Sequence, residues 1–408
     1  MSLIALALRN VARNRRRSLL TGGVVVFGFA AIALSGGFMS QSFEGLRDGT
    51  IRNGTGHLQF ADPAFFAGSE DAALEHGLLE SERATAILTQ DPEVQTVLPR
   101  IDFVGLATNG TRSVPFLGTG LDPSPEARTM DTATLLASGR WFQDANERGV
   151  VLGHGLARAL NVSAGDTITL LATTPEGVLN ALDATVTGLA DIPIKELDER
   201  YLATTLTLAS ELLVASGRVS KLVVVLREPA DATLALPRLL ASLHREGVEV
   251  AGKTWEELAV FYRQVRMLYL GIFGFMGLVL VVVVLLAAAN TMMMAATERT
   301  REIGTLRALG TRPSAIRRMF IAEGLILGVL GCVGGALLSL AIRVGLNHAG
   351  LILPPPPGVS HGMPLHVNFY VTAYAAAAIA MSATLVVASW WPARRAARLP
   401  IIEALAHV

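Results

Sequence analysis

The stretch from Met267 to Gly310 limits what this chain can fold into more than any other. Its first 24 residues, MLYLGIFGFMGLVLVVVVLLAAAN, carry no charged side chain. An α-helix rises ~1.5 Å per residue, so this run is ~36 Å long and can cross a bilayer core of ~30 Å. The next residues, TMMMAATERTREIGTLRALG, are charged with helical spacing, and a glycine ends them. The sequence therefore predicts a membrane helix that leads into a short charged helix.

Three further apolar runs have the length of a membrane helix. The chain of 408 residues is 51% hydrophobic and only 17% charged, with a mean hydropathy of +0.47. This excess is concentrated in the run above and in Leu19–Met39, Ile321–Ile342 and Phe369–Trp391. Runs of about 20 apolar residues exceed the usual core helix of a soluble protein. We therefore expect four transmembrane helices.

Basic residues flank these runs unevenly. Arginines dominate the first 18 residues, the 298–318 loop and the tail, whereas the 344–367 loop has no charged residue. Lys and Arg in short loops mark the cytoplasmic side. We therefore expect a multi-pass membrane protein with both termini cytoplasmic and a large extracytoplasmic domain.

The segment between the first two spans, Glu44–Arg266, has 19 basic and 30 acidic residues, a net charge of −11. This acidity excludes a basic nucleic-acid surface, so no nucleic acid is expected as a partner. The single cysteine, Cys332, lies in a span, so the segment has no disulfide. His361 and His366 have no Cys or carboxylate beside them, and we expect no metal site.

The same segment alternates strand and helix patterns at both of its ends. Near its start, the patterns predict a strand at HLQF (57–60), a helix at SERATAILTQ (81–90) and two strands at VQTVLP and IDFVGLAT. Near its end, they predict a strand at KLVVVL, a helix at DATLALPRLLASLHREG and a strand at VEVA. Short strands such as GVVLG, DTITLLA, ATVTGLA and ATTLTLA lie between them. These patterns predict an α+β extracytoplasmic domain, inserted between the first and second spans, with a β-rich subdomain at about 118–216.

The expected fold class is thus a membrane α-helical protein with four transmembrane helices plus that α+β domain. Residues 1–18 read as a cytoplasmic amphipathic helix, or equally as a plain basic flank. The expected boundaries are 1–18 for this helix, 19–43 for the first span, 44–266 for the periplasmic domain, 267–291 for the second span, 292–318 for the charged helix region, 319–344 for the third span, 345–367 for a Pro-rich periplasmic loop (with the Pro354–Pro357 strap), 368–391 for the fourth span and 392–408 for a cytoplasmic tail.

Two patterns suggest an ATPase site but fail physically. Leu34-Ser35-Gly36-Gly37 resembles an ATPase signature sequence, but it lies in the first span, where small residues serve close helix packing. Gly247–Thr254 matches the phosphate-loop letters G-x-x-x-x-G-K-[ST], yet its middle residues look like a strand, whereas phosphate needs a loop. Thr254 instead opens a capping box with Glu257, which predicts a helix running through Tyr262 into the second span. Catalytic motifs are lacking, so we expect no enzyme. Glu323, near the start of the third span, is expected to pair with Arg317 or Arg318, or to be solvated.

The segment from Glu298 to Gly310, ERTREIGTLRALG, closely resembles the ER-x-REIG-x-LRALG stretch of the FtsX/MacB family of ABC-transporter permeases. The following IRRMFIAEGLILG and the opening LALRNVARNRRRSLLT are similar as well. The layout of one span, a large outer domain and three spans is closest to the lipoprotein-releasing LolC/LolE type. MacB-type chains carry a fused ATPase, which this sequence does not contain.

This resemblance implies a mechanotransmitter of the bacterial inner (cytoplasmic) membrane, with its large domain periplasmic, that dimerises and binds a cytoplasmic ABC ATPase subunit through a coupling helix. ATP and magnesium would sit on that partner, with no cofactor in this chain. The alternative for the charged segment is an ordinary solvated helix face. The charges would key into a groove of the ATPase, Ile303 and Leu306 would be apolar anchors, and Gly304 would permit close approach. The coupling residues carried over are Glu298, Arg299, Arg301, Glu302, Ile303, Gly304, Leu306, Arg307, Leu309 and Gly310.

The expected function is a permease subunit that couples ATP hydrolysis to periplasmic handling or extraction of a lipidated or amphiphilic substrate. Alternatives are an efflux permease with a periplasmic adaptor, and a non-transporting scaffold controlling a cell-wall hydrolase. Expected partners also include a second permease copy or paralogue, membrane lipid and a periplasmic chaperone or adaptor. Small residues in the first span favour a helix that can part from its neighbour. Candidates for the membrane gap are Gly36, Phe38, Met39, Phe43, Phe261, Tyr262 and Met267.

Overall fold

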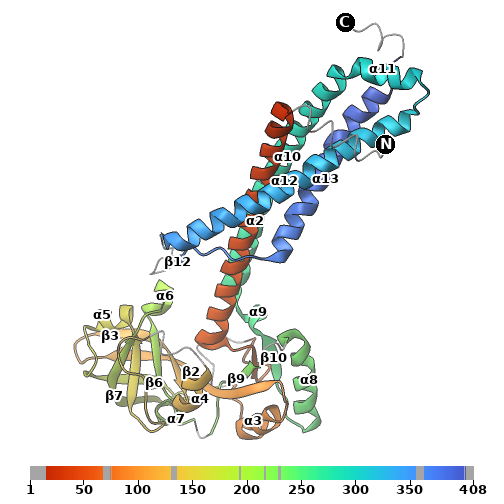
Figure 1. Ribbon diagram of the computed structural model, residues 1–408. Coiled ribbons are helices and arrows are strands. Elements are labelled where there is room, and N and C mark those ends of the chain that lie inside the picture. Colours follow the sequence, from red (N-terminus) through yellow and green to blue (C-terminus); the bar gives the residue numbers. More distant parts are fainter. Residues whose placement is uncertain are drawn as a thin grey trace. The chain divides into compact units, whose positions relative to one another are not determined.

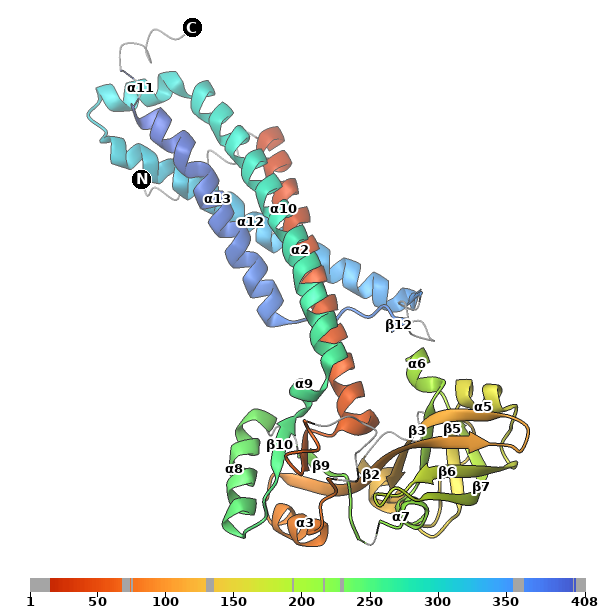
Figure 2. The same cartoon turned by 180° about the vertical axis from the view of Figure 1, so that it is seen from behind.

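A computed structural model describes residues 15–67, 74, 76–129, 136–192, 194–215, 217–227, 231–354, 363–398 and 400. Most of the expected amphipathic helix at 1–18 and most of the Pro354–Pro357 strap lie outside these residues. The chain forms two compact units (Figures 1 and 2). The helical unit comprises Met1–Glu44, Gln264–Ile352 and Pro364–Val408, and the α/β unit comprises Gly45–Arg263 and Leu353–Met363.

Long apolar helices build the helical unit. Among the described residues, four helices are long and apolar enough to cross a membrane, which confirms the expected number of spans. A shorter helix, α11, connects two of them. The helices are α2 (Arg15–Thr50), α10 (Val260–Glu298), α11 (Thr300–Ala308), α12 (Pro313–Ala349) and α13 (Val371–Arg398).

The core of this unit joins all four long helices. Val25 and Phe29 of α2 are buried in one cluster with Val284 of α10, Cys332 of α12 and Met381 of α13. α12 approaches α2 closely because glycines of α12, which have no side chain, lie at the contact. A Cβ on Gly335 would lie 2.7 Å from the Cβ of Phe29, and one on Gly331 would lie 2.5 Å from Cγ1 of Val25. The small residues of α12 therefore act as packing surfaces, as small-residue spacing in membrane helices predicts.

A mixed sheet with short helices forms the α/β unit. Ten of the described strands belong to the sheet, with the order β10-β1-β9-β2-β3-β8-β5-β7-β4 and with β6 pairing β2 and β7. The strands are β1 (Leu58–Ala61), β2 (Val94–Thr108), β3 (Ser113–Leu121), β4 (Leu136–Gly139), β5 (Gly149–Gly153), β6 (Thr167–Thr173), β7 (Leu179–Ala190), β8 (Tyr201–Thr205), β9 (Lys221–Leu226) and β10 (Ala251–Thr254). A separate pair comprises β11 (Ile352–Leu353) and β12 (Met363–Pro364).

Among the described residues of this unit, the shorter elements are a π-helical segment and seven helices. The segment η1 (Ile51–Thr55) follows α2 directly. The helices are α3 (Ser81–Thr89), α4 (Pro123–Thr129), α5 (His154–Leu160), α6 (Lys195–Asp198), α7 (Leu206–Leu213), α8 (Ala232–Arg245) and α9 (Trp255–Leu258).

The two expected strand–helix–strand groups are confirmed. The first is β1, α3 and β2, and the second is β9, α8 and β10. β9 lies between β1 and β2, and β1 also pairs with β10, so segments from both ends of the unit form one antiparallel base. The buried faces of β1 and β9 are almost wholly apolar, which explains why these short runs pair at the centre.

One long strand replaces two expected strands. β2 runs unbroken for 15 residues, and its first half pairs with β9 while its second half pairs with β3 and β6. Pro99 lies in the middle, opposite Leu222, and does not end the strand. Because β2 belongs to both the base and the β-rich region, the two share a sheet. The subdomain boundary at about 118–216 stays a prediction.

Several other expectations differ from the structure in position. The expected strand VEVA is irregular up to Val250, and β10 is formed by Ala251–Thr254, so the phosphate-loop letters lie partly in a strand paired with β1. The run ATTLTLA is divided between β8 and α7 because Thr205 caps α7, accepting a hydrogen bond from the Leu208 amide. The expected cap at Thr254 is confirmed, but its helix ends at Ala259 (φ −78°, ψ 73°) before α10 begins.

A buried ion pair ties three elements of the α/β unit together. Arg100 of β2 contacts the carboxylate of Glu126 on α4, and its Nη1 donates a hydrogen bond of 2.8 Å to the carbonyl of Gly54 in η1. The side chains of Arg100 and Glu126 are 8% and 2% exposed. Burial raises the pKa of Glu126, and the guanidinium of Arg100 partly opposes this rise. Burial also raises the pKa of Tyr201 to about 12.

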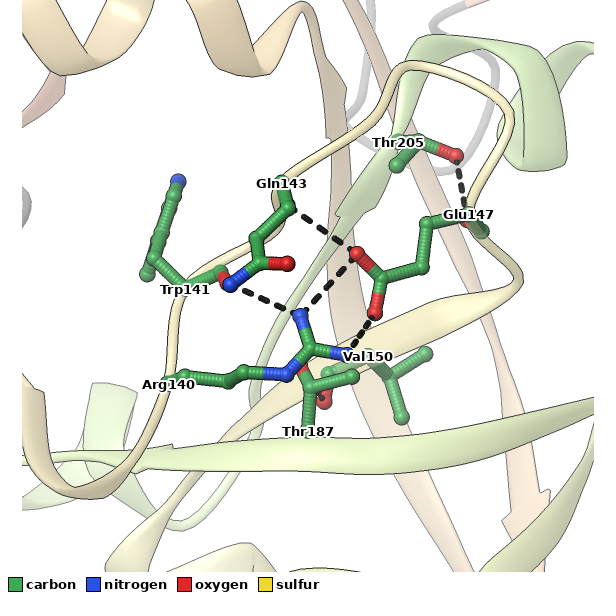
Figure 3. A network of polar contacts seen from close by, with 7 residues as sticks. All are labelled: Arg140, Trp141, Gln143, Glu147, Val150, Thr187 and Thr205. Carbon is green, nitrogen blue, oxygen red and sulfur yellow. Dashed lines mark hydrogen bonds and ion pairs between the residues drawn. The ribbon is translucent and has the colours of Figure 1, made fainter.

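A second ion pair closes the loop between β4 and β5 (Figure 3). Glu147 accepts hydrogen bonds from both terminal nitrogens of Arg140, at 3.1 and 2.5 Å, and from the amide of Gln143 at 3.0 Å. The hydroxyl of Thr205 donates to the Glu147 carbonyl at 3.1 Å. The hydrogen bond from Arg140 lowers the pKa of Glu147 below its ordinary value. This network fixes the loop against β8 at the surface.

Candidate functional site

The charged segment after α10 forms a short helix held between two breaks. α10 ends at Glu298, and Arg299 has a non-helical backbone (φ −105°, ψ 14°) before α11 begins. Gly310 ends the segment with φ +92°, a conformation that favours glycine. The amides of Gly310 and Thr311 donate to the carbonyls of Arg307 and Leu306, both at 3.0 Å. The expected stop at Gly310 is confirmed.

The residues of this segment divide between two faces. The exposed face carries two acids, a base and two leucines, with Leu306 39% and Leu309 79% exposed. We name this face the coupling surface, and it consists of Glu298, Arg301, Glu302, Leu306 and Leu309. Gly310 is also exposed and Arg307 is half-buried, whereas Arg299, Ile303 and Gly304 are buried. The coupling residues that the family resemblance implies thus divide into an exposed group and a buried group.

Ile303 differs from its expected place. It is 1% exposed and packs in an apolar cluster within the helical unit, so it is not available as an anchor for a partner. Gly304 is buried too, which leaves Leu306 and Leu309 as the large apolar side chains that the segment exposes. We name this cluster the α11 core, and it consists of Ala295, Ala296, Ile303, Ile316, Phe320, Ala393, Ala396 and Ala397. Because it draws on α10, α12 and α13, the α11 core seats α11 on the ends of three helices.

The expected partner of Glu323 was wrong. Its carboxylate pairs with Arg299, with 3.0 Å between Oε2 and Nη1, whereas Arg317 and Arg318 are exposed. The side chains of Arg299 and Glu323 are 4% and 3% exposed. The ion pair therefore joins the break before α11 to α12, ten residues beyond Pro313 at its start. Sequence spacing could not single out Arg299, because several arginines lie within reach of Glu323 along the chain.

A second candidate site is an apolar cavity of about 210 Å³ between α2 and α10. These helices lie side by side in both views (Figures 1 and 2). The cavity lies toward the ends of α2 and α10 that lead into the α/β unit. It is lined by Ile32, Ser35, Gly36, Met39, Leu270, Phe273, Gly274, Met276, Gly277 and Leu280. Gly274 and Gly277 of α10 have open space where a Cβ would lie, and among the lining side chains only Ser35 brings a hydroxyl to the cavity.

The expected gap residues divide into three groups. Gly36 and Met39 line the cavity. Phe38 makes a T-shaped contact with Phe273 of α10 (ring centroids 6.3 Å apart), and Phe43 a tilted contact with Tyr269 (6.0 Å). Met267 is 66% exposed.

Phe261 and Tyr262, however, belong to the α/β unit and not to the cavity. Tyr262 is buried against Trp255, with ring centroids 4.9 Å apart. The cavity residues of α10 were missed in the sequence. The signal that could have found them is the spacing of Gly274 and Gly277 within an otherwise bulky run.

Family models match both parts of the chain. A model of the MacB-like periplasmic core domain matches residues 18–241, more than half of the chain, and a model of the FtsX-like permease C-terminal region matches residues 274–401. The first match includes the α/β unit up to α8, and the second includes α11 and most of the helical unit.

Individual relatives are similar at modest identity. The lipoprotein-releasing system transmembrane protein LolC of Xylella fastidiosa is 26% identical over 342 residues, covering 80% of this chain and 81% of the relative. LolE of Haemophilus influenzae is 25% identical over 64% of this chain, and the match spans 63% of that relative, less than two thirds of its length. The macrolide export ATP-binding/permease protein MacB of Salmonella paratyphi A is 32% identical over 39% of this chain and 21% of its own.

Proposed function

We propose, from the premise that this chain belongs to the FtsX/MacB family of ABC-transporter permeases, that it transmits the motion of a separate cytoplasmic ATPase to its extracytoplasmic domain. The chain is a membrane permease component of the LolC/MacB type. The coupling surface carries this proposal. The surface is part of a short helix and presents exposed leucines beside charges, and its leucines would be more stable buried in a groove of a partner protein than exposed to water.

The coupling surface is suited to docking because its chemistry is mixed. Leu306 and Leu309 are exposed apolar side chains, which provide the buried centre of an interface, and Glu298, Arg301 and Glu302 surround them with both signs of charge. Complementary charges select the partner and its orientation. The ATPase, with its ATP and magnesium, would dock here from the cytoplasm, and both termini of the permease would be cytoplasmic.

Reversing the charges at the centre of the coupling surface tests this assignment. The variant Arg301→Glu/Glu302→Arg keeps the net charge but inverts its pattern, so each charge meets a like charge on the partner. We expect the amount of ATPase subunit that co-purifies with the permease to fall by about tenfold or more, which corresponds to a loss of at least ~1.4 kcal/mol of binding free energy. ATPase stimulation by the permease should fall with it.

The matched control exchanges an exposed ion pair in the α/β unit. Arg148 and Glu211 are 2.8 Å apart with side chains 59% and 46% exposed, and Arg148→Glu/Glu211→Arg should leave co-purification unchanged. Wild-type ATPase stimulation by the Arg301/Glu302 variant would remove the coupling assignment.

The cavity between α2 and α10 supports the second half of the proposal, that the permease handles a lipidated or amphiphilic substrate. Its lining is apolar apart from Ser35, and it is formed by two helices only. A hydrocarbon chain that enters from the outer leaflet moves from one apolar environment into another, so an apolar lining admits it without desolvating polar groups. The names of the LolC and LolE relatives state lipoprotein release for those proteins, and we propose the same substrate class here.

Filling the cavity should block substrate entry. A Cβ at Gly277 would meet nothing within 4 Å, so Gly277→Leu adds an apolar side chain at the cavity lining without a clash at its Cβ. With a photo-crosslinker at Met39, we expect capture of lipoproteins by the wild type and a drop of about tenfold in Gly277→Leu, which equals ~1.4 kcal/mol.

Gly271→Leu is the matched control, because Gly271 also has open space but does not line the cavity. Capture unchanged by Gly277→Leu would contradict the cavity as the substrate site. Capture of a cell-wall hydrolase or an adaptor, only by probes on the α/β unit, would favour the signalling or efflux alternatives.

The exposed face of α10 supports a second permease copy or a paralogue as a partner. Only 11% of its apolar window is buried within the chain, against 33%, 33% and 28% in α2, α12 and α13. Large side chains such as Phe275, Leu278 and Leu286 are 61 to 70% exposed. We propose that part of this face contacts the second copy and that the rest faces lipid.

A further inference from the structure

The strongest unexplained feature of the helical unit is the buried Arg299–Glu323 ion pair. Two charges have been removed from water here, and such a pair is retained only if its geometry and its surroundings compensate for the lost hydration. Glu323 belongs to no exposed surface and Arg299 does not face a partner, since their side chains are 3% and 4% exposed. Docking of an ATPase on the coupling surface therefore does not account for either residue.

The pair lies where the backbone alone would allow a hinge. α10 and α11 are separated at Arg299, whose backbone is not helical and whose position has no side-chain cap. A break of this kind lets a short helix swing relative to the helix before it. The guanidinium of Arg299 instead reaches α12, where Glu323 holds it at 3.0 Å.

The surroundings of the pair fix α12 to its neighbours. Ile303 of α11 packs in the α11 core with Ile316 and Phe320 of α12 and with alanines of α13. Next to Glu323, a Cβ on Gly324 would lie 2.0 Å from Oγ of Ser389, so α12 and α13 are in direct contact at this level. The break before α11 is thus enclosed by three helices.

We propose that Arg299 and Glu323 are positioning residues that lock α11 onto α12, so that a displacement of α11 moves the third span as well as the second. The proposal rests on the function proposed above for the coupling surface. It adds a second route of transmission, through α12, to the route through α10. The ion pair stays closed throughout the ATPase cycle, because opening it would separate two opposite charges that are buried away from water.

The test measures the distance between spin labels at Ala308 of α11 and Arg318 of α12, in the full-length chain with Cys332→Ala. Both label sites are exposed. In the wild-type background we expect one narrow distance distribution, identical for the permease alone and for its ATPase complex with or without trapped nucleotide. In Glu323→Gln the charge is lost and we expect the distribution to broaden. Arg317→Gln, which removes an exposed charge from the same helix, should leave it narrow.

A second variant guards against misfolding of the first. Arg299→Met/Glu323→Leu removes the pair while keeping similar volumes and no unpaired charge, so the chain should accumulate normally, yet the distribution should still broaden. A narrow distribution in both variants would overturn the proposal. So would a wild-type shift of about 5 Å, roughly one helical turn, between nucleotide states. The variants are compared in the permease alone, without the ATPase. If the ATPase fails to dock, the proposed function is refuted, but the effect of the variants on the distance distribution is still measured.

Discussion

Replacing Arg100 by methionine is expected to destabilise the α/β unit by about 3–5 kcal/mol, the usual cost of removing one partner of a buried ion pair. The carboxyl of Glu126, 2% exposed, would lose its guanidinium, and the Gly54 carbonyl would lose a 2.8 Å hydrogen bond. Pulse proteolysis of the full-length chain in urea, following cleavage within the α/β unit, measures the loss.

The control for this prediction is Arg148→Met. Arg148 and Glu211 form an ion pair too, but both side chains are about half exposed, so the change should stay within about 1 kcal/mol. The double variant Arg100→Met/Glu126→Leu should recover most of the loss, because no buried charge remains. Equal losses in Arg100→Met and Arg148→Met would show that burial does not set the strength of the first pair.

The loss of stability that Arg100→Met causes, called the deficit below, should also depend on pH. Burial already raises the pKa of Glu126, and losing the arginine raises it further. An acid whose pKa is higher in the folded state binds a proton on folding, so the folded state loses stability as the pH rises above the unfolded value. The deficit should therefore be largest at neutral pH and shrink as the pH falls toward the folded-state pKa of Glu126 in the wild type, which lies above the ordinary glutamate value of about 4.3.

Placing leucine at Gly335 is the second change with a large expected effect. Its Cβ alone would lie 2.7 Å from the Cβ of Phe29, and Phe29 is buried in the core of the helical unit. α2 and α12 must separate to admit the new side chain, and such overpacking costs about 1–3 kcal/mol or more. We expect a lower amount of the full-length protein in membranes and a lower melting temperature in detergent.

Gly345→Leu provides the matched control on the same helix, since a Cβ there meets nothing within 4 Å. Phe29→Ala combined with Gly335→Leu should restore part of the stability by making space opposite the leucine. A Gly335→Leu protein that melts like the Gly345→Leu protein would disprove close packing between α2 and α12.

The sequence determined the elements whose signal is local. Four apolar runs predicted the four long helices, because a bilayer sets the required length and composition. The alternation of strand and helix around Leu58 and Lys221 predicted the base of the α/β unit, and Gly310 and Thr254 marked real helix ends. Each of these features depends on residues that are close together in the sequence, so the local sequence is enough to predict it.

Only the tertiary structure decided which residues face which partner. Helical spacing placed Ile303 and Leu306 together in one charged segment, but the α11 core buries the first and leaves the second exposed. Glu323 pairs with Arg299 and not with its nearer arginines, and the cavity takes its lining from α2 and α10, more than 200 residues apart along the chain. These facts depend on how helices distant in sequence pack, and packing between distant segments leaves no local trace in either one.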